Sequence, residues 1–228
     1  SKVEIIDKYD IYQHLMQYWA ETMQDDAYLI GVNGWKAEIT QIKNKKGKET
    51  GWNCDLIPKE IVTNKYFLND RNKIDDLIAE AEKISLQILS LDEENTGEED
   101  LFSECRKDDG KIEKKEVPKR IKEIKNNSEF KEELKVLQEY LSLVDKEADL
   151  RKQIKESELE LDKKLLVKYR TLTEEEIKKL VVEDKWINTL HNYVKTEIES
   201  ISQSLAGRIK ELAERYETPL PKLKNNVD

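Results

Sequence analysis

Two histidines are the side chains of this sequence that could move a proton near neutral pH. His14 lies four residues before Tyr18, on one face of a predicted helix, and could serve as an acid or base. His191 lies beside an apolar stripe near the C-terminus. Because neither histidine has a matching nucleophile, a partly buried structural role is favoured for His14 and an ordinary hydrogen-bonded flank position for His191.

The cysteines and paired aspartates are poorly spaced for metal binding. Cys54 and Cys105 are far apart and have no CxxC motif or neighbouring histidine, which argues against a zinc site and a disulfide-stapled secreted fold. We therefore expect reduced thiols and a cytoplasmic location. Asp25-Asp26 and Asp108-Asp109 lack further oxygen ligands at regular spacing, so solvated turns are the better interpretation.

Motifs for cofactor or hydrolytic chemistry are missing from the sequence. Gly31 and Gly34 form only a GxxG with hairpin spacing, and no glycine-rich turn leads from a predicted strand into a helix. GxxxxGK(S/T), HExxH and GxSxG are also absent. The sequence therefore predicts no catalytic, cofactor-binding or metal-binding residues.

Local lysine clusters interrupt an otherwise acidic chain. Its 40 Lys and Arg against 49 Asp and Glu give a formal net charge of −9, which does not attract nucleic acid. Lys43, Lys45, Lys46 and Lys48 form one cluster, and residues 111–125 contain another. Without interleaved aromatic residues, solvated loops are favoured over DNA contacts. The tryptophans at positions 35, 52 and 186 are interpreted as hydrophobic anchors.

The composition favours long helices over a single thick core. Hydrophobic residues make up 37% of the chain and charged residues 39%, with only seven Gly and four Pro. No apolar run approaches the roughly 20 residues that span a bilayer. We expect a soluble, mainly α protein of long antiparallel helices, either coiled-coil or bundle-like.

Residues 1–70 are predicted to form a small mixed α/β module. Asp10 can cap a helix that reaches Met23. Residues 27–32 and 35–42 have the character of strands, and Asn33-Gly34 between them is a strong hairpin pattern. A third strand ending near Cys54 completes a three-stranded antiparallel β meander.

Residues 71–228 are predicted to form an elongated helical domain with long arms. After a helix that begins at Pro58, apolar residues recur every seven positions in two series: Ile74, Ala81, Ile88, and Leu77, Ile84, Leu91. This spacing is typical of a coiled-coil arm or of a helix packed inside a bundle. The arm is expected to end near Asn95, at a flexible acidic tip over about 92–110.

The second arm and the final helix follow from capping patterns. A helical region begins near Pro118, and Ser128 can cap a long returning helix. Thr173 and Glu176 have capping-box spacing, and Asp184 can cap the final helix.

The final helix carries an eleven-residue repeat, typical of a nearly straight helix. Three series share this spacing: Ile187, Ile198, Ile209; Leu190, Ile201, Leu212; and Val194, Leu205, Tyr216. A helix of this extent is about 45 to 50 Å long and needs an equally long partner surface. We expect these nine residues, with Gly207, to form a partner interface. Pro219 ends the helix.

Several stretches together resemble the modification subunit of type I restriction-modification systems. The similar segments are DIYQHLMQYW (10–19), MQDDAYLI (23–30), Gly51-Trp52, DLIPK (55–59), Tyr66-Phe67, LVVEDKW (180–186) and GRIKELAERYETPLP (207–221). Their order and spacing over most of the chain make the resemblance fairly specific, although none is a catalytic motif.

The resemblance implies a role in assembly. That family's subunit is an S-adenosylmethionine-dependent adenine-N6 DNA methyltransferase that joins a specificity subunit and, in the full complex, a restriction subunit. Its glycine-containing cofactor loop and its Asn-Pro-Pro-aromatic motif do not occur here. We therefore expect a C-terminal segment that binds no cofactor, docks the specificity subunit and meets DNA only through the complex. A generic coiled-coil scaffold and an independent enzyme are the alternatives.

Overall fold

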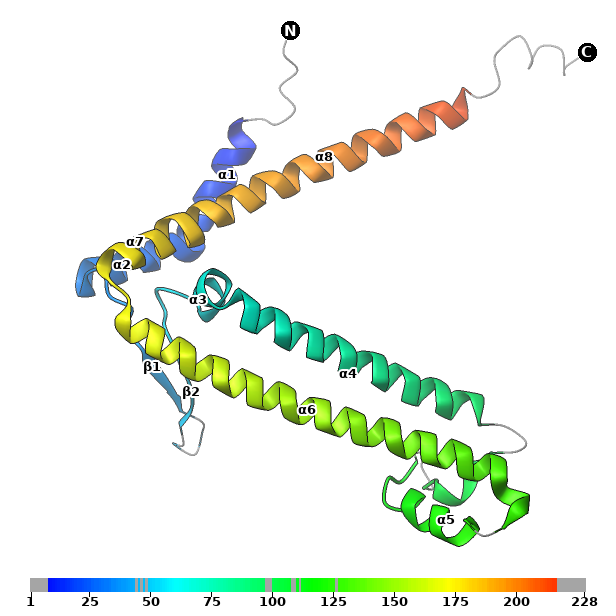
Figure 1. Ribbon diagram of the computed structural model, residues 1–228. Helices are drawn as coiled ribbons and strands as arrows, with labels where there is room; N and C mark the ends of the chain where they lie inside the picture. The colour runs from blue at the N-terminus through cyan, green and yellow to red at the C-terminus, as the bar shows by residue number, and fades with distance from the viewer. Residues whose placement is uncertain are drawn as a thin grey trace, which may run out of the picture. The chain divides into compact units, whose positions relative to one another are not determined.

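The computed structural model is mainly helical and divides into two compact units (Figure 1). One unit comprises residues 1–62 and 168–228, and the other comprises residues 63–167. The structure describes residues 8–43, 45, 47, 49–96, 100–107, 110, 112–125 and 127–216. No helix in these ranges is both long enough and apolar enough to cross a membrane.

The first unit begins with one continuous helical run. α1 (Lys8–Tyr18) passes through the π-helical segment η1 (Trp19–Met23) into α2 (Gln24–Asn33). The start predicted at Asp10 is therefore too late. The strand predicted over residues 27–32 is also wrong, because Gly34 ends a helix: its φ is 75° and its N–H donates to the carbonyl of Ile30 at 2.9 Å. Glycine with positive φ serves helix ends as well as hairpin turns.

The sheet has two strands, which corrects the predicted three-stranded meander. β1 (Thr40–Lys43) pairs antiparallel with β2 (Glu49–Asn53), in a register that places Thr40 opposite Asn53. The chain between the two strands is thus the lysine-rich segment 44–48, and not Asn33-Gly34. Asn33-Gly34 instead precedes residues 35–39, which belong to no helix or strand and lead to β1.

The last three helical segments also run on without a break. α7 (Glu174–Lys179) opens with the predicted capping box, in which Thr173 and Glu176 bond reciprocally. It continues through the π-helical segment η4 (Leu180–Ile187) into α8 (Asn188–Arg215). Asp184 lies inside η4, so the cap predicted there is wrong. α8 ends at Arg215 with Tyr216 as its C-cap, shortly before Pro219, the residue that the sequence predicts to stop the helix.

The core of the first unit gathers around the loop that follows β2. Buried apolar side chains come from this loop, from the start of α3 (Lys59–Tyr66), from the end of α6 (Lys131–Thr171) and from η4. Buried residues of this core include Cys54, Leu56, Ile57, Val62, Tyr169, Leu180 and Val181. The Tyr169 hydroxyl donates to the Ile57 carbonyl at 2.8 Å, and its ring meets Trp52 edge-on at 5.0 Å.

The second unit is a helical hairpin. α4 (Leu68–Glu94) packs antiparallel against α6, and the predicted heptad positions Ala81 and Ile84 meet Leu150 in its core. The two arms therefore pair with each other. Polar links follow the same register: Ser85 donates to Glu147 at 2.7 Å, and Lys164 lies 3.3 Å from Asp70.

The end of this hairpin has a small core of its own. The short segments η2 (Ser103–Cys105), α5 (Val117–Ile124) and η3 (Ser128–Phe130) surround Phe102 and Cys105, which contact Leu137 and Tyr140 of α6. Arg106 binds both Asp92 and Asp100, at 2.5 and 2.6 Å. Within the acidic stretch over 92–110, the structure thus describes buried apolar residues and a partly buried ion-pair cluster, neither of which was predicted from the sequence.

Candidate protein-docking surface

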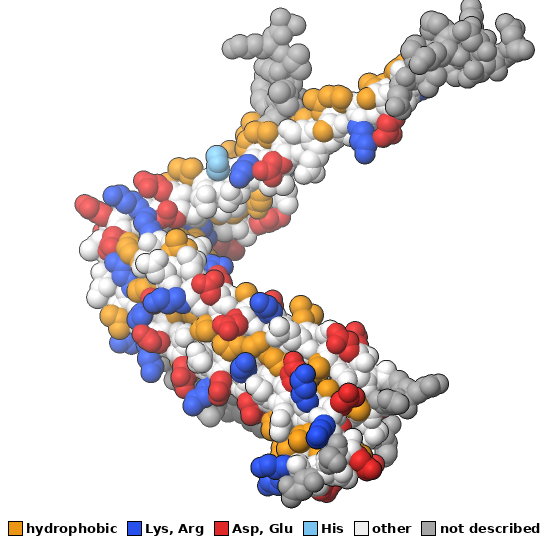
Figure 2. Space-filling view, turned by 45° about the vertical axis from the view of Figure 1, so that its right-hand side comes forward, with side chains coloured by type: hydrophobic (Ala, Val, Ile, Leu, Met, Phe, Trp, Pro, Cys, Tyr) orange, Lys and Arg blue, Asp and Glu red, His pale blue; other side chains and the backbone are white. Residues whose placement is uncertain are grey.

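α8 exposes the apolar stripe that its eleven-residue repeat predicts. None of its residues is buried, and six residues of the stripe are exposed: Ile187, Ile198, Leu205, Ile209, Leu212 and Tyr216. Leu190, Val194 and Ile201 are half-buried, and Gly207 is exposed. Hydrophobic side chains follow one edge of this helix in Figure 2.

The C-terminal half of α8 has no tertiary support in the described structure. Every residue from Ser202 to Tyr216 is exposed, including Leu205 at 58% and Ile209 at 59%. Isolated helices of this length are marginal in water, because most helical stability in proteins comes from packing of an apolar face. Exposed apolar patches of this kind mark interaction sites.

The N-terminal half of α8 is held by α1. His14 stacks on Tyr193 with ring centroids 5.6 Å apart, and Tyr18 meets the same ring edge-on at 6.1 Å. The Nε2 atom of His14 lies 3.8 Å from a carboxylate oxygen of Glu197. His14 thus sits in a helix–helix contact, in agreement with the structural role favoured from the sequence.

A buried ion pair fixes the base of α8. The Lys185 ammonium donates to Asp26 at 2.7 Å and to the Leu56 carbonyl at 2.8 Å, and the Trp186 indole donates to the other Asp26 oxygen at 2.8 Å. Lys185 and Asp26 are 8% and 3% exposed. The hydrogen bonds of this cluster link α2 and the loop after β2 to η4. Their loss would be strongly destabilising, because a buried charge would be left without its partner.

The π-helical turn around Lys185 positions this cluster. The Lys185 carbonyl accepts hydrogen bonds from Thr189 at 2.5 Å and from the buried Tyr18 hydroxyl at 3.4 Å. Widened π turns leave backbone groups available for such bonds and often occur where function requires a distortion. Burial raises the pKa of Tyr18, which keeps this hydroxyl protonated as a donor.

The residues that suggested catalysis or metal binding are not assembled into a site. Cys54 and Cys105 lie in different units, and burial raises the pKa of both thiols, which disfavours the reactive thiolate. His191 is exposed on α8, and Asp26 is engaged by Lys185. Among the described residues, no group of three His, Cys, Asp or Glu could hold a metal ion. Asp108-Asp109 lies outside the described residues.

The predicted basic clusters lie partly outside the described residues, whereas the three predicted tryptophan anchors lie within them. Lys43 and Lys45 are exposed, whereas Lys46, Lys48 and Lys111 lie outside the described residues. The three tryptophans predicted to be anchors contact other side chains. Trp52 is buried beneath Lys59, Trp186 bonds to Asp26, and Trp35 lies under the ammonium of Lys178.

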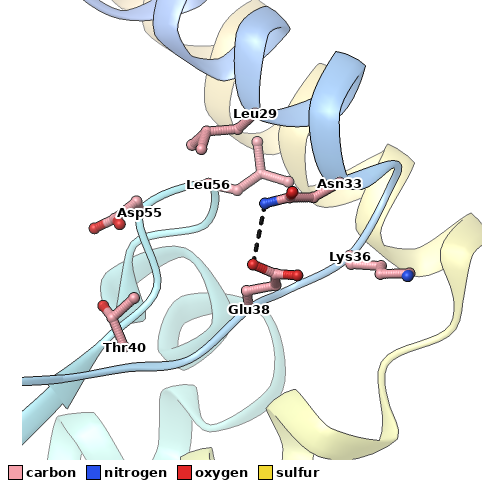
Figure 3. A pocket seen from close by; sticks show the side chains of 7 residues that line it. All are labelled: Leu29, Asn33, Lys36, Glu38, Thr40, Asp55 and Leu56. Carbon is pink, nitrogen blue, oxygen red and sulfur yellow. Dashed lines mark hydrogen bonds between the residues drawn. The ribbon is translucent and has the colours of Figure 1, made fainter.

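One small pocket of the first unit opens beside the sheet (Figure 3). Its cavity volume is about 50 Å³, well below that of typical small-molecule sites. Its lining residues are Leu29, Asn33, Lys36, Glu38, Thr40, Asp55 and Leu56. The Asn33 amide donates to Glu38 at 3.0 Å across it, so two of its polar groups already satisfy each other. No feature of this lining favours a particular ligand.

The start of the first unit also exposes apolar side chains, which was not predicted from the sequence. Ile11, Tyr12, Leu15 and Met16 of α1 are exposed, as is Trp19 at the start of η1. The sequence contained a signal for this exposure: apolar residues occur on more than one side of the helix, so a single buried face cannot hold all of them.

No protein-family model, no curated protein and no solved structure matches this chain.

Proposed function

We propose that this chain is a non-catalytic, C-terminal assembly segment of a type I restriction-modification DNA methyltransferase subunit. In this role it docks to the specificity subunit in the cytoplasm, so that the parent complex can methylate adenine N6 in DNA. The restriction subunit joins the same complex, and DNA is reached only through the assembly. S-adenosylmethionine binds elsewhere in the parent subunit.

The observation that carries this proposal is the bare apolar stripe along α8. Its residues recur every eleven positions over 28 helical residues, so a straight partner helix can follow the stripe for about 42 Å. Helix-in-groove recognition uses apolar anchors of this kind. The resemblance to the modification subunit implies a specificity subunit as partner, and the helical spacers of that subunit have a suitable shape.

Three separate segments of the resemblance support the proposal by meeting in the structure. Asp26, from the stretch 23–30, binds Lys185 and Trp186, from the stretch 180–186. The Leu56 carbonyl, from the stretch 55–59, accepts a hydrogen bond from the same lysine. The segments similar to the modification subunit thus include the residues that hold the base of α8.

Energetic magnitudes indicate how much of α8 the partner must cover. Full burial of Leu205, Ile209 or Leu212 contributes about 1.5–3 kcal/mol each, whereas association costs an estimated 4–15 kcal/mol in lost freedom of motion. The C-terminal half alone would therefore bind weakly. The specificity subunit must also contact residues nearer the start of the helix.

Co-purification tests the proposal. The chain is co-expressed with a tagged specificity subunit from the same genome, and complexes are measured by affinity capture and light scattering. We expect a stable complex that the double variant Leu205→Asp, Leu212→Asp weakens at least tenfold. The matched control Lys210→Glu, on another side of α8, leaves binding unchanged.

Two results would contradict the proposal. A chain that does not bind the specificity subunit but forms homo-oligomers through α8 would be a generic coiled-coil scaffold. A chain that alone binds S-adenosylmethionine in calorimetry would be an independent enzyme.

A further inference from the structure

The contacts between α1 and α8 determine which sides of the two helices face each other. His14 contacts Tyr193 and Glu197, whereas Tyr18, one turn later, contacts Tyr193 and the backbone of Lys185. Partner numbers on α8 fall as those on α1 rise, so the helices run antiparallel, as Figure 1 also shows.

Helical spacing then places the apolar residues of both helices. At about 100° per residue, the α8 stripe lies roughly a quarter turn from the side that carries Tyr193 and Glu197. On α1, the centre of Tyr12, Leu15, Met16 and Trp19 lies roughly a third of a turn from the side that carries His14 and Tyr18. On each helix, the rotation from the contact side to the apolar side runs in the same direction when viewed along that helix from its N-terminus to its C-terminus.

Because the helices are antiparallel, rotations of the same sense lead to the same side of the pair. The exposed apolar side chains of α1 therefore lie on the same side of the pair as the α8 stripe, with Leu15 nearest to the stripe and Met16 farthest round the helix. The exposed fractions agree with this arrangement. Leu190, Val194 and Ile201 are half-buried beside α1, and Leu15 is less exposed than Tyr12.

Charges beside the stripe indicate the chemistry of the occupant. Arg208 and Arg215 follow the same edge of α8 as Glu197, at seven-residue spacing, and neither makes an ion pair within the described part of the chain. Glu199, Glu211 and Glu214 lie farther round the helix, away from the stripe. A complementary helix would carry carboxylates opposite the two arginines.

We propose that α1 and α8 form one two-helix docking face for an amphipathic helix of another protein, with acidic residues along the edge that meets Arg208 and Arg215. This inference rests on the proposed function: the occupant is a helical spacer of the specificity subunit. The apolar side of that helix lies between the α8 stripe and Tyr12, Leu15, Met16 and Trp19.

A second copy of this chain fits the face less well. Along the edges of its own stripe, α8 offers a single carboxylate, Glu197, which already faces His14. A lipid surface also fits less well, because α8 carries four basic and four acidic residues. Helices that lie on membranes are rich in Lys and Arg on their polar face.

Substitutions in α1 test the shared face. The full chain and a co-expressed specificity subunit are used, and folding of each variant is checked by circular dichroism. We expect the double variant Tyr12→Asp, Met16→Asp to weaken binding at least tenfold, because aromatic anchors dominate interfaces. The control Gln13→Asp, exposed on another side of α1, changes affinity less than twofold.

Charge reversal tests the acidic edge of the partner. Arg208→Glu with Arg215→Glu should lower affinity roughly tenfold and slow association, whereas the control Lys210→Glu should leave both unchanged. Unchanged binding by this arginine variant would overturn the predicted partner chemistry.

The outcomes separate this inference from the proposed function. If Leu205→Asp with Leu212→Asp abolishes binding but the α1 variants bind normally, only the shared face is overturned. If none of the variants affects binding, the proposed docking of the specificity subunit on α8 is contradicted as well. A homodimer dissolved by the same α1 substitutions, or flotation with phosphatidylserine vesicles, would identify a different occupant and overturn the inference.

Discussion

At the scale of single residues, the buried pair of Asp26 and Lys185 is the interaction with the largest expected effect on the first unit. Two further groups bind it: the Leu56 carbonyl accepts from Lys185, and the Trp186 indole donates to Asp26. Such a pair contributes modestly to the free energy of folding, but a structure that leaves one of the two charges buried without its partner is strongly destabilised.

Asp26→Asn should therefore lower the free energy of unfolding by about 3–5 kcal/mol, because Lys185 would keep its charge without a counterion. Urea unfolding followed by tryptophan fluorescence measures the change. Asp25→Asn, one residue earlier and exposed, is the matched control and should stay within about 0.5 kcal/mol of the wild type. Equal effects of the two substitutions would mean that the pair is not buried in solution.

In the second unit, Glu147 makes stability depend on pH. The hydrogen bond that Ser85 donates at 2.7 Å, with further help from Arg151, holds the pKa of this carboxyl below its usual value. The unfolded chain therefore binds more protons in the acid range. The stabilisation is present above the unfolded pKa of roughly 4.3 and is lost as the pH falls through the folded value.

Ser85→Ala should reduce this acid-dependent loss. We expect the difference in unfolding free energy between pH about 6 and about 3 to be smaller in the variant than in the wild type. Ser90→Ala is the control, since Ser90 bonds the exposed Glu94 on the same helix. If both variants show the wild-type pH profile, the Ser85 hydrogen bond does not shift the pKa of Glu147.

At the scale of elements, helices with long periodic patterns were predictable, and short elements were not. The heptads of α4, the returning α6 and the extent of α8 follow from apolar spacing, which a helix of many turns repeats several times. Asn33-Gly34 shows the opposite case. Its preference for positive φ is the same in a hairpin and at a helix end, so local residues alone do not decide between them.

Gly207 offers a prediction at this scale because it interrupts the helix α8, on the side away from the apolar stripe. A Cβ added there would meet nothing within 4 Å inside this chain, so Gly207→Ala should stabilise α8 by up to about 1 kcal/mol. Circular dichroism melting of the isolated chain measures this gain.

The sequence-based expectation that a partner backbone approaches closely at Gly207 predicts that the same variant binds the specificity subunit less well. Because Gly207 lies on the side of α8 away from the stripe, this contact would be additional to the docking stripe. Ala206→Gly serves as the control for helix propensity, since it changes the neighbouring residue in the opposite direction. Unchanged affinity of Gly207→Ala would remove the close approach while leaving the docking stripe intact.

At the scale of the whole molecule, the contacts that orient α8 join residues far apart in the sequence, which explains why the sequence analysis could not predict them. Asp26 and Lys185 are separated by 159 positions, and no local pattern marks them as partners. Asp26 was therefore interpreted as part of a solvated turn. The α8 stripe was predictable because its spacing is local, whereas its extension across α1 depends on these distant contacts.

The uneven support of α8 leads to a prediction for hydrogen exchange of the chain. Near Lys185 the helix is held by buried partners, but from Ser202 onward all its side chains are exposed. Local opening requires little free energy where few apolar contacts are broken. We therefore expect amides of residues 205–216 to exchange much faster than those around Leu180 in the isolated chain.

Binding of the specificity subunit should protect residues 205–216 and leave the amides around Leu180 unchanged. Protection by the partner would follow from burial of the stripe, because a ligand that binds the ordered helix stabilises it by mass action. The Leu205→Asp, Leu212→Asp variant provides the control, since it should remain unprotected at the same partner concentration. Equal, slow exchange along all of α8 in the isolated chain would mean that this helix is already covered, most simply by a second copy, and would remove the physical reason for a separate partner.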